Sequence, residues 1–261
     1  REQGITLTGK NCGQEERAPM CGIPYHAADS YLTKLVNKGY KVAICEQVED
    51  PKLAKGLVKR EVIRVVTPGT NLNVQSLEAG KNNYLLSIAY TPDGIGISAA
   101  DVTTGDYYVT EVEDLKKLND ELMKYEPSEI ICNEAFLVSG FDVNDLKSRL
   151  HISVNALESH MFDDDGCRRI LMKHFKVNTL IGLGVEEFPT GLLAAGALLQ
   201  YLYDTQKTDL EHFTHIYPYL TSKYMLLDSS TRRNLELTET LREKQKRGSL
   251  LWGLDKAEAA E

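Results

Sequence analysis

Residues 18–70 read APMCGIPYHAADSYLTKLVNKGYKVAICEQVEDPKLAKGLVKREVIRVVTPGT, and this stretch decides the fold of the first part of the chain. Apolar side chains recur with helical spacing from Ala28 to Val36, and Gly39 supplies the left-handed residue that ends such a helix. β-branched residues at 41–45 and 60–66 predict two strands, and the Pro-Gly pair at 68–69 stops the second one. The stretch therefore predicts a helix on a small sheet.

The composition is that of an ordinary globular protein. A length of 261 residues favours about two domains with enough material for a core in each, and the chain is 42% apolar and 26% charged. No segment approaches the run of about 18 apolar residues that spans a bilayer, and no signal peptide begins the chain, so we expect a cytosolic protein. Five widely spaced cysteines without a Cys-x-x-Cys pair predict free, mostly buried thiols rather than disulfides or a zinc site.

The charge is divided unevenly along the chain. The net charge is −8, which argues at first against nucleic acid. Residues 1–70 nevertheless hold eleven Lys and Arg against eight Asp and Glu, a balance of +3, whereas residues 71–261 hold nineteen against thirty, a balance of −11. A surface that meets DNA is therefore expected in the first seventy residues, although scattered charges of this kind are also typical of a solvated face.

The rest of the chain predicts a second α/β domain at residues 81–206, after a polar linker at 71–80. Turn residues separate three strand-like runs, which predicts an antiparallel meander, and a helix and a buried strand follow. These five elements are strands at 84–90, 94–100 and 106–110, a helix from residue 114 that Pro127 stops, and a strand at 129–132. The order is β-β-β-α-β.

Helices alternate with one strand in the second half of this domain. We expect helices at 145–150, 163–175 and 189–204 and a strand at 151–154, and the last helix is apolar around most of its circumference, as a central packing helix is. Residues 205–215 read as an exit linker, and the final region of the chain is placed at 207–261. A last helix is predicted there, capped by Asp228 or Ser229 and running through Leu235, Leu237 and Leu241.

Several of these strings resemble one family. Residues 19–51, PMCGIPYHAADSYLTKLVNKGYKVAICEQVEDP, and 55–70, KGLVKREVIRVVTPGT, resemble the second half of the mismatch-binding domain of the MutS family of DNA mismatch-repair proteins. Five further strings resemble the same family and occur in the same order: DVTTG at 101–105, GLGV at 182–185, AAG at 194–196, LQY at 199–201 and LDSSTRRNLEL at 227–237. The resemblance covers the chain to about Lys256.

The resemblance implies an α/β, two-domain piece of a longer protein. It would comprise part of the mismatch-binding domain at 1–70, a ribonuclease-H-like connector domain at 81–206 and the start of a helical core. The family implies a bacterial, cytoplasmic, nucleoid-associated homodimer that hydrolyses ATP with Mg²⁺. No G-x-x-x-x-G-K-[ST] string occurs in this sequence, so we expect neither ATP hydrolysis nor a cofactor in this chain.

Duplex DNA with mismatches is the ligand that the resemblance implies. Family members bring the loop equivalent to Met20–Pro24 to the minor groove and place basic residues at the positions of Lys10 and Arg60 near the backbone. Gly22 suits such a loop because it lacks a Cβ, while Met20 is open to two interpretations, a wedge in the groove or packing over the helix. The family's Phe-x-Glu element, which reads the mispair, is absent from this sequence, so we expect DNA binding with little preference for a mispair.

A partner surface is expected on the helix at 163–176. One stripe of this helix, which we expect to face the sheet, contains Cys167, Ile170, Leu171, His174 and Phe175. The other side would expose Arg168, Arg169, Met172, Lys173 and Lys176. The resemblance implies contact with a MutL-like matchmaker protein, for which this side is our candidate, although the helix dipole alone also favours cations near a C-terminus.

Two other functions compete with DNA binding and coupling. The first is a stand-alone interaction module, in which residues 1–70 only cap the connector. The second is a metal nuclease, which needs several carboxylates around divalent cations. Asp101 precedes a turn whose N–H groups it is expected to bind, and the acids at 163–165 precede a helix that they would cap, so we favour a chain without catalytic or metal-binding residues.

Overall fold

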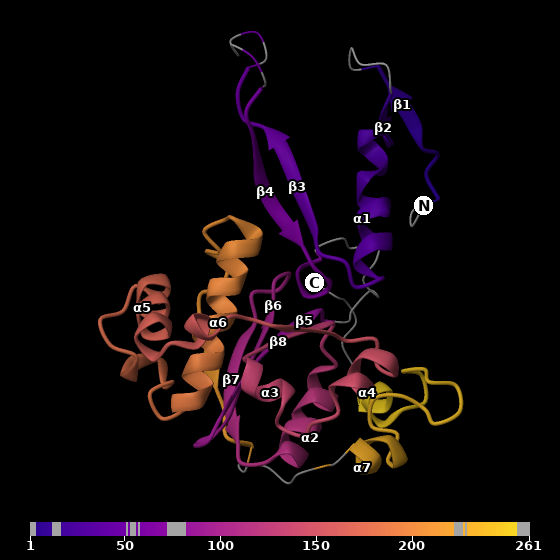
Figure 1. The fold of residues 1–261 in the computed structure, drawn as a ribbon. Helices are drawn as coiled ribbons and strands as arrows, with labels where there is room; N and C mark the ends of the chain where they lie inside the picture. Colours follow the sequence, from indigo (N-terminus) through magenta and orange to yellow (C-terminus); the bar gives the residue numbers. More distant parts are fainter. Residues whose placement is uncertain are drawn as a thin grey trace.

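The computed structural model describes residues 4–11, 17–50, 52, 56, 58–71, 82–221, 227 and 229–254. Two slender ribbons and a helix rise from a larger body that is built on one sheet (Figure 1). None of the described helices has the length and apolar character that crossing a bilayer requires. The predicted linker at 71–80 lies outside the described residues, apart from Asn71, which is buried.

The first part of the chain forms two separate antiparallel ribbons. Its elements are β1 (Thr8–Lys10), β2 (Ala18–Met20), η1 (Tyr25–Ala27), α1 (Ala28–Val36), β3 (Val42–Gln47), β4 (Arg60–Val66) and η2 (Pro68–Thr70). β1 pairs with β2, and β3 pairs with β4 across a bulge at Ile44 and Cys45. The predicted helix and both predicted strands are confirmed, and Gly39 has the expected left-handed φ of 82°.

A six-stranded sheet with the order β10-β7-β6-β5-β8-β9 forms the second part. The bounds are β5 (Tyr84–Thr91), β6 (Gly94–Asp101), β7 (Tyr107–Val112), β8 (Glu129–Cys132), β9 (Ser153–Ala156) and β10 (Tyr217–Pro218). β5, β6 and β7 are antiparallel neighbours, while β8, β9 and β10 each pair in parallel. The predicted meander and the β-β-β-α-β order are confirmed, and β9 begins two residues later than expected.

Helices cover both faces of this sheet (Figure 1). They are α2 (Leu115–Tyr125), α3 (Glu134–Leu137), α4 (Val143–Ser148), α5 (Asp164–Phe175) and α6 (Pro189–Gln206), with η3 (Ser159–Phe162) and η4 (Ile181–Leu183) between them. Successive residues of β5 point to opposite faces, so Leu85 belongs to the cluster under α6 and Leu86 to the cluster under α2. The two-domain α/β class is therefore confirmed.

Two glycines set the distances around α6. A Cβ on Gly96 of β6 would lie 1.9 Å from the Thr190 carbonyl oxygen, so the start of α6 meets the sheet backbone directly. A Cβ on Gly196 would lie 2.3 Å from the Cys167 Cβ, so α5 packs closely on the outer side of α6. The stripe of α5 was expected to face the sheet, and this is corrected: α6 lies between most of α5 and the sheet.

Residues 205–215 are not the linker that the sequence indicated. Leu210, Phe213 and Ile216 are buried in the cluster under α6, and β10 then adds a parallel strand beside β7. These three apolar residues recur every third position among exposed polar ones, so the segment looks polar while one side of it contacts the core. The second domain therefore continues past residue 206 to at least Tyr219, whose N–H donates to the Val109 carbonyl.

The C-terminal region also differs from its prediction. In place of one long helix, the chain forms α7 (Ser229–Asn234), which is followed by a turn with φ of 49° at Glu236, and later α8 (Leu250–Leu254). Leu235 and Leu241, through which the predicted helix was expected to run, both lie beyond the end of α7 and are exposed. Asp228, the alternative cap, lies outside the described residues.

The described residues of the first part do not form a hydrophobic core of their own. In the described part of the chain, the buried residues of the apolar clusters lie between Leu85 and Ile216, and the described residues before position 71 contribute only Val36 and Val66 to the buried apolar side chains. The reason is geometric, because one helix and two narrow ribbons cannot enclose a common interior. The expectation of a core in each domain is therefore wrong for these residues.

Replacing Leu210 by Ala should lower the free energy of unfolding by about 2 to 4 kcal/mol, because a 3% exposed side chain would leave a cavity under α6. Leu220→Ala is the matched control, since that side chain is 57% exposed and should cost less than about 1 kcal/mol. Urea unfolding followed by circular dichroism measures both. Equal losses would contradict the placement of residues 205–215 in the core.

Thiol reactivity should divide the cysteines by domain. Cys21 and Cys45 are exposed, contrary to the expectation of mostly buried thiols, whereas Cys132 and Cys167 are buried. Burial raises the pKa of Cys132 to about 11 and that of Cys167 to about 12, so less than about one in a hundred of either thiol is ionised at pH 8. Iodoacetamide at pH 8 should modify the first two within minutes and spare the others until urea is added, as peptide mass spectrometry would show. Rapid native labelling of Cys167 would contradict its burial between α5 and α6.

Candidate nucleic-acid interface

The β1–β2 hairpin carries two of the predicted DNA contacts on one face. Thr8 pairs with Met20, and Lys10 pairs with Ala18. Residues directly opposite in antiparallel strands share a face, as do alternate residues of one strand, so Lys10 and Met20 lie on the same side of the hairpin. Lys10 is exposed and Met20 is 45% exposed. The hairpin thus presents a cation and an apolar side chain together.

The segment from β2 to η1 is open to solvent. Gly22 and Pro24 are both exposed, and a Cβ on Gly22 would meet no atom within 4 Å. Gly22 is therefore not required by packing within the described residues, which leaves close approach of a ligand as a physical reason for a glycine there. Tyr25 begins η1 and is 91% exposed, so a large aromatic side chain stands beside the same segment.

Arg60 lies on the other ribbon. It begins β4, pairs with Gln47 at the end of β3 and is exposed. Its neighbour Lys59 forms a 2.5 Å ion pair with Glu61, whereas no ionic partner of Arg60 is found in the described part of the chain. Arg60 is consequently a cation of β4 that is available to an anionic ligand.

The two ribbons project in the same direction, away from the six-stranded sheet, with α1 between them (Figure 1). The structure thus brings Lys10, Met20, Gly22 and Pro24 together along one hairpin and its exit, and it places Arg60 on the separate β3–β4 ribbon. A ligand that contacted both groups would have to extend across α1. A rod-like polyanion such as duplex DNA meets that requirement.

A groove of about 670 Å³ lies between α1 and the β3–β4 ribbon, and the sequence did not indicate it. Its lining is largely apolar, including Ile23, Leu32, Ile44 and Ile63, with Arg64 at one side. Burial lowers the pKa of the Arg64 guanidinium, which donates to the Thr70 carbonyl at 3.0 Å. The helical stripe of α1 that was expected to pack on a sheet faces this groove.

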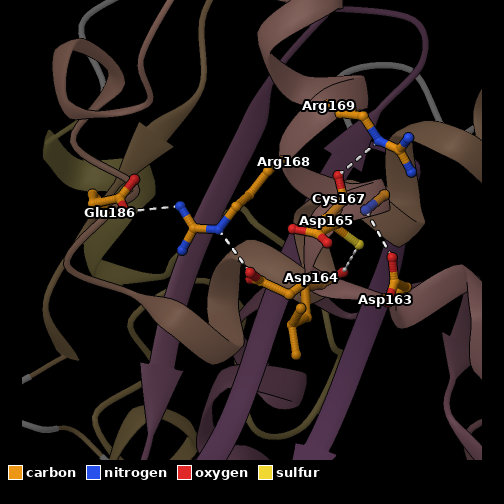
Figure 2. A network of polar contacts seen from close by, with 9 residues as sticks. Asp163, Asp164, Asp165, Cys167, Arg168, Arg169 and Glu186 are labelled. Carbon is orange, nitrogen blue, oxygen red and sulfur yellow. Dashed lines mark hydrogen bonds and ion pairs between the residues drawn. The ribbon is translucent and has the colours of Figure 1, made fainter.

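The predicted partner helix α5 begins with acids that cap it. The Asp163 carboxylate accepts from the Gly166 N–H at 2.9 Å, as the capping prediction stated. Arg168 is held between two acids (Figure 2): its Nη1 lies 2.7 Å from Glu186 Oε1 and its Nε lies 2.8 Å from Asp164 Oδ2. Bonds to Glu186 and Asp164 raise the pKa of Arg168. This cation is therefore already neutralised within the chain.

The remaining residues of the α5 surface differ in exposure. Arg169 and Lys173 are exposed, and Arg169 Nε donates to the Asp165 carbonyl at 3.1 Å (Figure 2). Met172 was expected to be exposed, and this is corrected: it is partly buried and packs against the cluster under α6. Because α5 packs closely on α6, Met172 adds to the buried stripe, and Arg169 and Lys173 form the outward face.

The carboxylates considered for a metal have structural partners. Asp101 is fully buried, and its Oδ1 accepts from the Thr103 N–H at 2.7 Å and from the Thr103 hydroxyl, while its Oδ2 accepts from the Asn83 N–H at 3.0 Å. The prediction that Asp101 binds turn N–H groups is confirmed. In the part of the chain that the structure describes, no group of three or more His, Cys, Asp or Glu side chains is arranged to hold a metal ion.

One functional candidate was missed altogether, a buried carboxylate where the two parts of the chain meet. Glu129 of β8 accepts hydrogen bonds from the Gly69 N–H and from the hydroxyl of Tyr201. The sequence held a signal for it, since a glutamate directly before three apolar residues of a buried strand needs partners. The Pro-Gly pair at 68–69 was interpreted only as a strand stop.

Comparison with known proteins agrees with this architecture. A model of MutS domain I matches residues 1–75, and a model of MutS domain II matches residues 83–214. The DNA mismatch repair protein MutS of Lachnoclostridium phytofermentans is 65% identical over 260 residues, which are 100% of this chain and 28% of that protein. The corresponding protein of Ruminiclostridium cellulolyticum is 51% identical over 259 residues, 98% of this chain and 29% of its own length.

A third relative, the DNA mismatch repair protein MutS of Acetivibrio thermocellus, is 49% identical over 261 residues, again 98% of this chain and 29% of its own length. The chain thus spans less than a third of these relatives. The domain II model alone covers about half of the chain, and the domain I model covers most of the rest. The chain belongs to the MutS family.

Proposed function

We propose that this chain binds duplex DNA with mismatches and couples that binding to recruitment of a MutL-like protein, with no catalysis by its own residues. The observation that carries the proposal is the common direction of the two ribbons, which expose Lys10 and Arg60 far from the acidic second domain. The relatives are named as mismatch repair proteins, which agrees with this role. In the whole protein, ATP, Mg²⁺ and a second subunit in the bacterial cytoplasm would complete the activity.

Charge favours contact through the ribbons. Binding to DNA depends on cations that replace the counterions of the phosphates, and the balance of +3 in residues 1–70 contrasts with −11 in the remainder. A duplex is therefore attracted to the ribbons and repelled by the six-stranded sheet and its helices. Met20 beside Lys10 suits a shallow apolar contact with the minor groove.

Reading of the mispair would be weak in this chain. Contacts with phosphates position a protein but carry no sequence information, and no Phe-x-Glu element is present in the 261 residues to stack on a base. We therefore expect similar affinity for paired and mispaired duplexes. The alternative function, a protein-interaction module without DNA affinity, predicts no binding to either one.

Lys10→Ala and Arg60→Ala should each weaken binding to all duplexes and reduce the slope of log K against log salt by up to about one. Fluorescence anisotropy with a labelled duplex, with and without one mispair, across a salt series measures this. Lys116→Ala is the matched control, because Lys116 is an exposed cation of α2 in the second domain and should leave the slope unchanged.

Three results would contradict the proposal. Absence of salt-dependent binding would favour the interaction module. A preference of tenfold or more for the mispair would show that a reading element exists elsewhere in the chain. Cleavage of the duplex on addition of Mg²⁺ would support the nuclease function instead.

The partner surface that we propose is the outward face of α5. Arg169 and Lys173 are exposed cations on a domain with an acid excess, so they can attract an acidic patch on a partner. Arg168 remains in the proposed surface as an arginine fixed by Glu186 and Asp164, and Met172 contributes the part of its side chain that is not buried. The arrangement suits a small polar contact with a MutL-like protein.

Changing Arg169 and Lys173 together to Glu should abolish co-elution with a purified bacterial MutL protein. Both side chains are exposed, so the free energy of unfolding should change by less than about 1 kcal/mol. The control changes Lys116 and Lys147, two other exposed cations of the second domain, to Glu and alters the net charge equally. Co-elution that survives in the first variant, or is lost in both, would exclude α5 as the specific surface.

A further inference from the structure

The chain passes from the β3–β4 ribbon to the second domain through residues 67–71. This turn is tightly held: Thr67 and Thr70 bond to each other reciprocally, and Arg64 donates to the Thr70 carbonyl. On the other side, the Asn83 amide donates to the carbonyls of Pro68 and Asn71 at 3.1 and 3.3 Å. We call residues 67–71 the joint between the ribbon and the second domain. Hydrogen bonds from the ribbon and from the second domain both hold it in place.

The backbone of Gly69 lies very close to the second domain. A Cβ on this residue would lie 2.9 Å from the Leu85 Cβ and 3.0 Å from the Glu129 Cβ, both of which belong to central strands of the sheet. Contacts this short leave no room for any side chain. The backbone of the turn therefore rests directly on β5 and β8.

Glu129 bonds to this backbone from inside the second domain. It is fully buried, and its Oε2 accepts from the Gly69 N–H at 3.1 Å, while its Oε1 accepts from Asn155 Nδ2 at 3.0 Å and from the Tyr201 hydroxyl at 2.8 Å. A buried carboxylate is costly unless donors surround it, and three donors do so here. Burial and the neighbouring Glu129 raise the pKa of Tyr201, so its hydroxyl stays a donor.

The two parts of the chain meet again on the Tyr201 side chain. Lys41, one residue before β3, places its Nζ 5.2 Å from the centre of the Tyr201 ring, close enough for a cation–π contact. Tyr201 therefore links the start of β3 with Glu129, and Glu129 links the turn after β4 with β8 and β9. Both strands of the ribbon are held at the same end by this one cluster.

We propose that Glu129 is a positioning residue, which fixes the direction of the β3–β4 ribbon relative to the second domain and thereby the place where Arg60 meets DNA. The DNA part of this inference rests on the proposed function, whereas the direction of the ribbon does not. Asn155 and Tyr201 belong to the same domain as Glu129. Of the three described hydrogen bonds to the Glu129 carboxylate, the one from the Gly69 N–H therefore connects the second domain to the ribbon.

The length of the ribbon amplifies small errors at the joint. Six residue steps separate Val66 from Arg60 in β4, which corresponds to about 20 Å at about 3.3 Å per residue. A tilt of about 10° at the joint would therefore displace Arg60 by about 3 Å, which exceeds the tolerance of a hydrogen bond to a phosphate oxygen. A carboxylate far from the ligand can thus decide whether the ribbon contacts DNA.

Two variants break the joint in different ways. Glu129→Gln keeps the shape but turns one acceptor into an amide N–H₂, which then faces one of the three donors. Gly69→Ala inserts a Cβ between Leu85 and Glu129. Their matched controls are Glu158→Gln, an exposed acid, and Gly182→Ala, where an added Cβ meets no atom within 4 Å.

The measurement is a distance between two nitroxide labels by double electron–electron resonance, without DNA. One label is attached after Gln47→Cys at the far end of β3 and one after Lys116→Cys on α2, with residues 12, 21 and 45 changed from Cys to Ser. The parent chain and both controls should give one narrow distribution. Glu129→Gln and Gly69→Ala should shift or broaden it by about 3 Å or more, and duplex affinity should fall by about threefold to tenfold.

An unchanged distance in Gly69→Ala, with native circular dichroism, would overturn the inference and leave Glu129 as a structural residue of the second domain. A lowered melting temperature without a shifted distance in Glu129→Gln would overturn it in the same way. Should Glu129→Gln fail to fold, Gly69→Ala alone decides. A shifted distance with unchanged duplex affinity would retain the joint and overturn the role of the ribbon in DNA binding.

Discussion

The fit of α6 against the six-stranded sheet is the contact on which the rest of the structure depends. The Tyr107 hydroxyl donates to the Ala195 carbonyl in the middle of this helix, and Gly96 lets the helix start meet the sheet backbone. The outer side of α6 supports α5 through Gly196, and Tyr201 near its C-terminal end reaches Glu129 at the joint. One central helix therefore contacts both α5, which carries the proposed partner surface, and the residue that reaches Glu129.

Local patterns predicted most elements because their causes are local. The strand at 60–66 follows from its β-branched residues, and the helix at 115–125 follows from helical spacing, the capping Asp114 and a stopping proline, all of which act within a few residues. Residues 205–215 were interpreted as a linker because their structure depends on distant residues: Phe213 packs on Tyr107, and the strand β10 that follows them pairs with β7. Tertiary burial determines such a segment, and no periodic signal of a helix or strand marks it.

The candidate site shows the same division between local and distant causes. Exposed cations such as Arg60 and a capping acid such as Asp163 were identified from the sequence and its family resemblance, since exposure and capping need no knowledge of neighbours. The prediction that Met172 is exposed was wrong because the width of the buried stripe on α5 depends on how this helix packs on α6. The role of Glu129 was missed because it depends on a hydrogen bond from Gly69, which is sixty residues away in the chain.

The first part of the chain holds its shape differently from the second. Among the apolar side chains that the structure describes there, only Val36 and Val66 are buried, and both lie at the end nearest the second domain, so hydrophobic burial contributes little to fixing the ribbons. A buried polar joint is well suited to this situation because hydrogen bonds specify direction, whereas apolar contacts tolerate sliding. The charge distribution then acts on a ribbon whose direction is already set. In the proposed function, a duplex attracted to Lys10 and Arg60 and repelled by the acidic second domain would approach along the side where the ribbons extend.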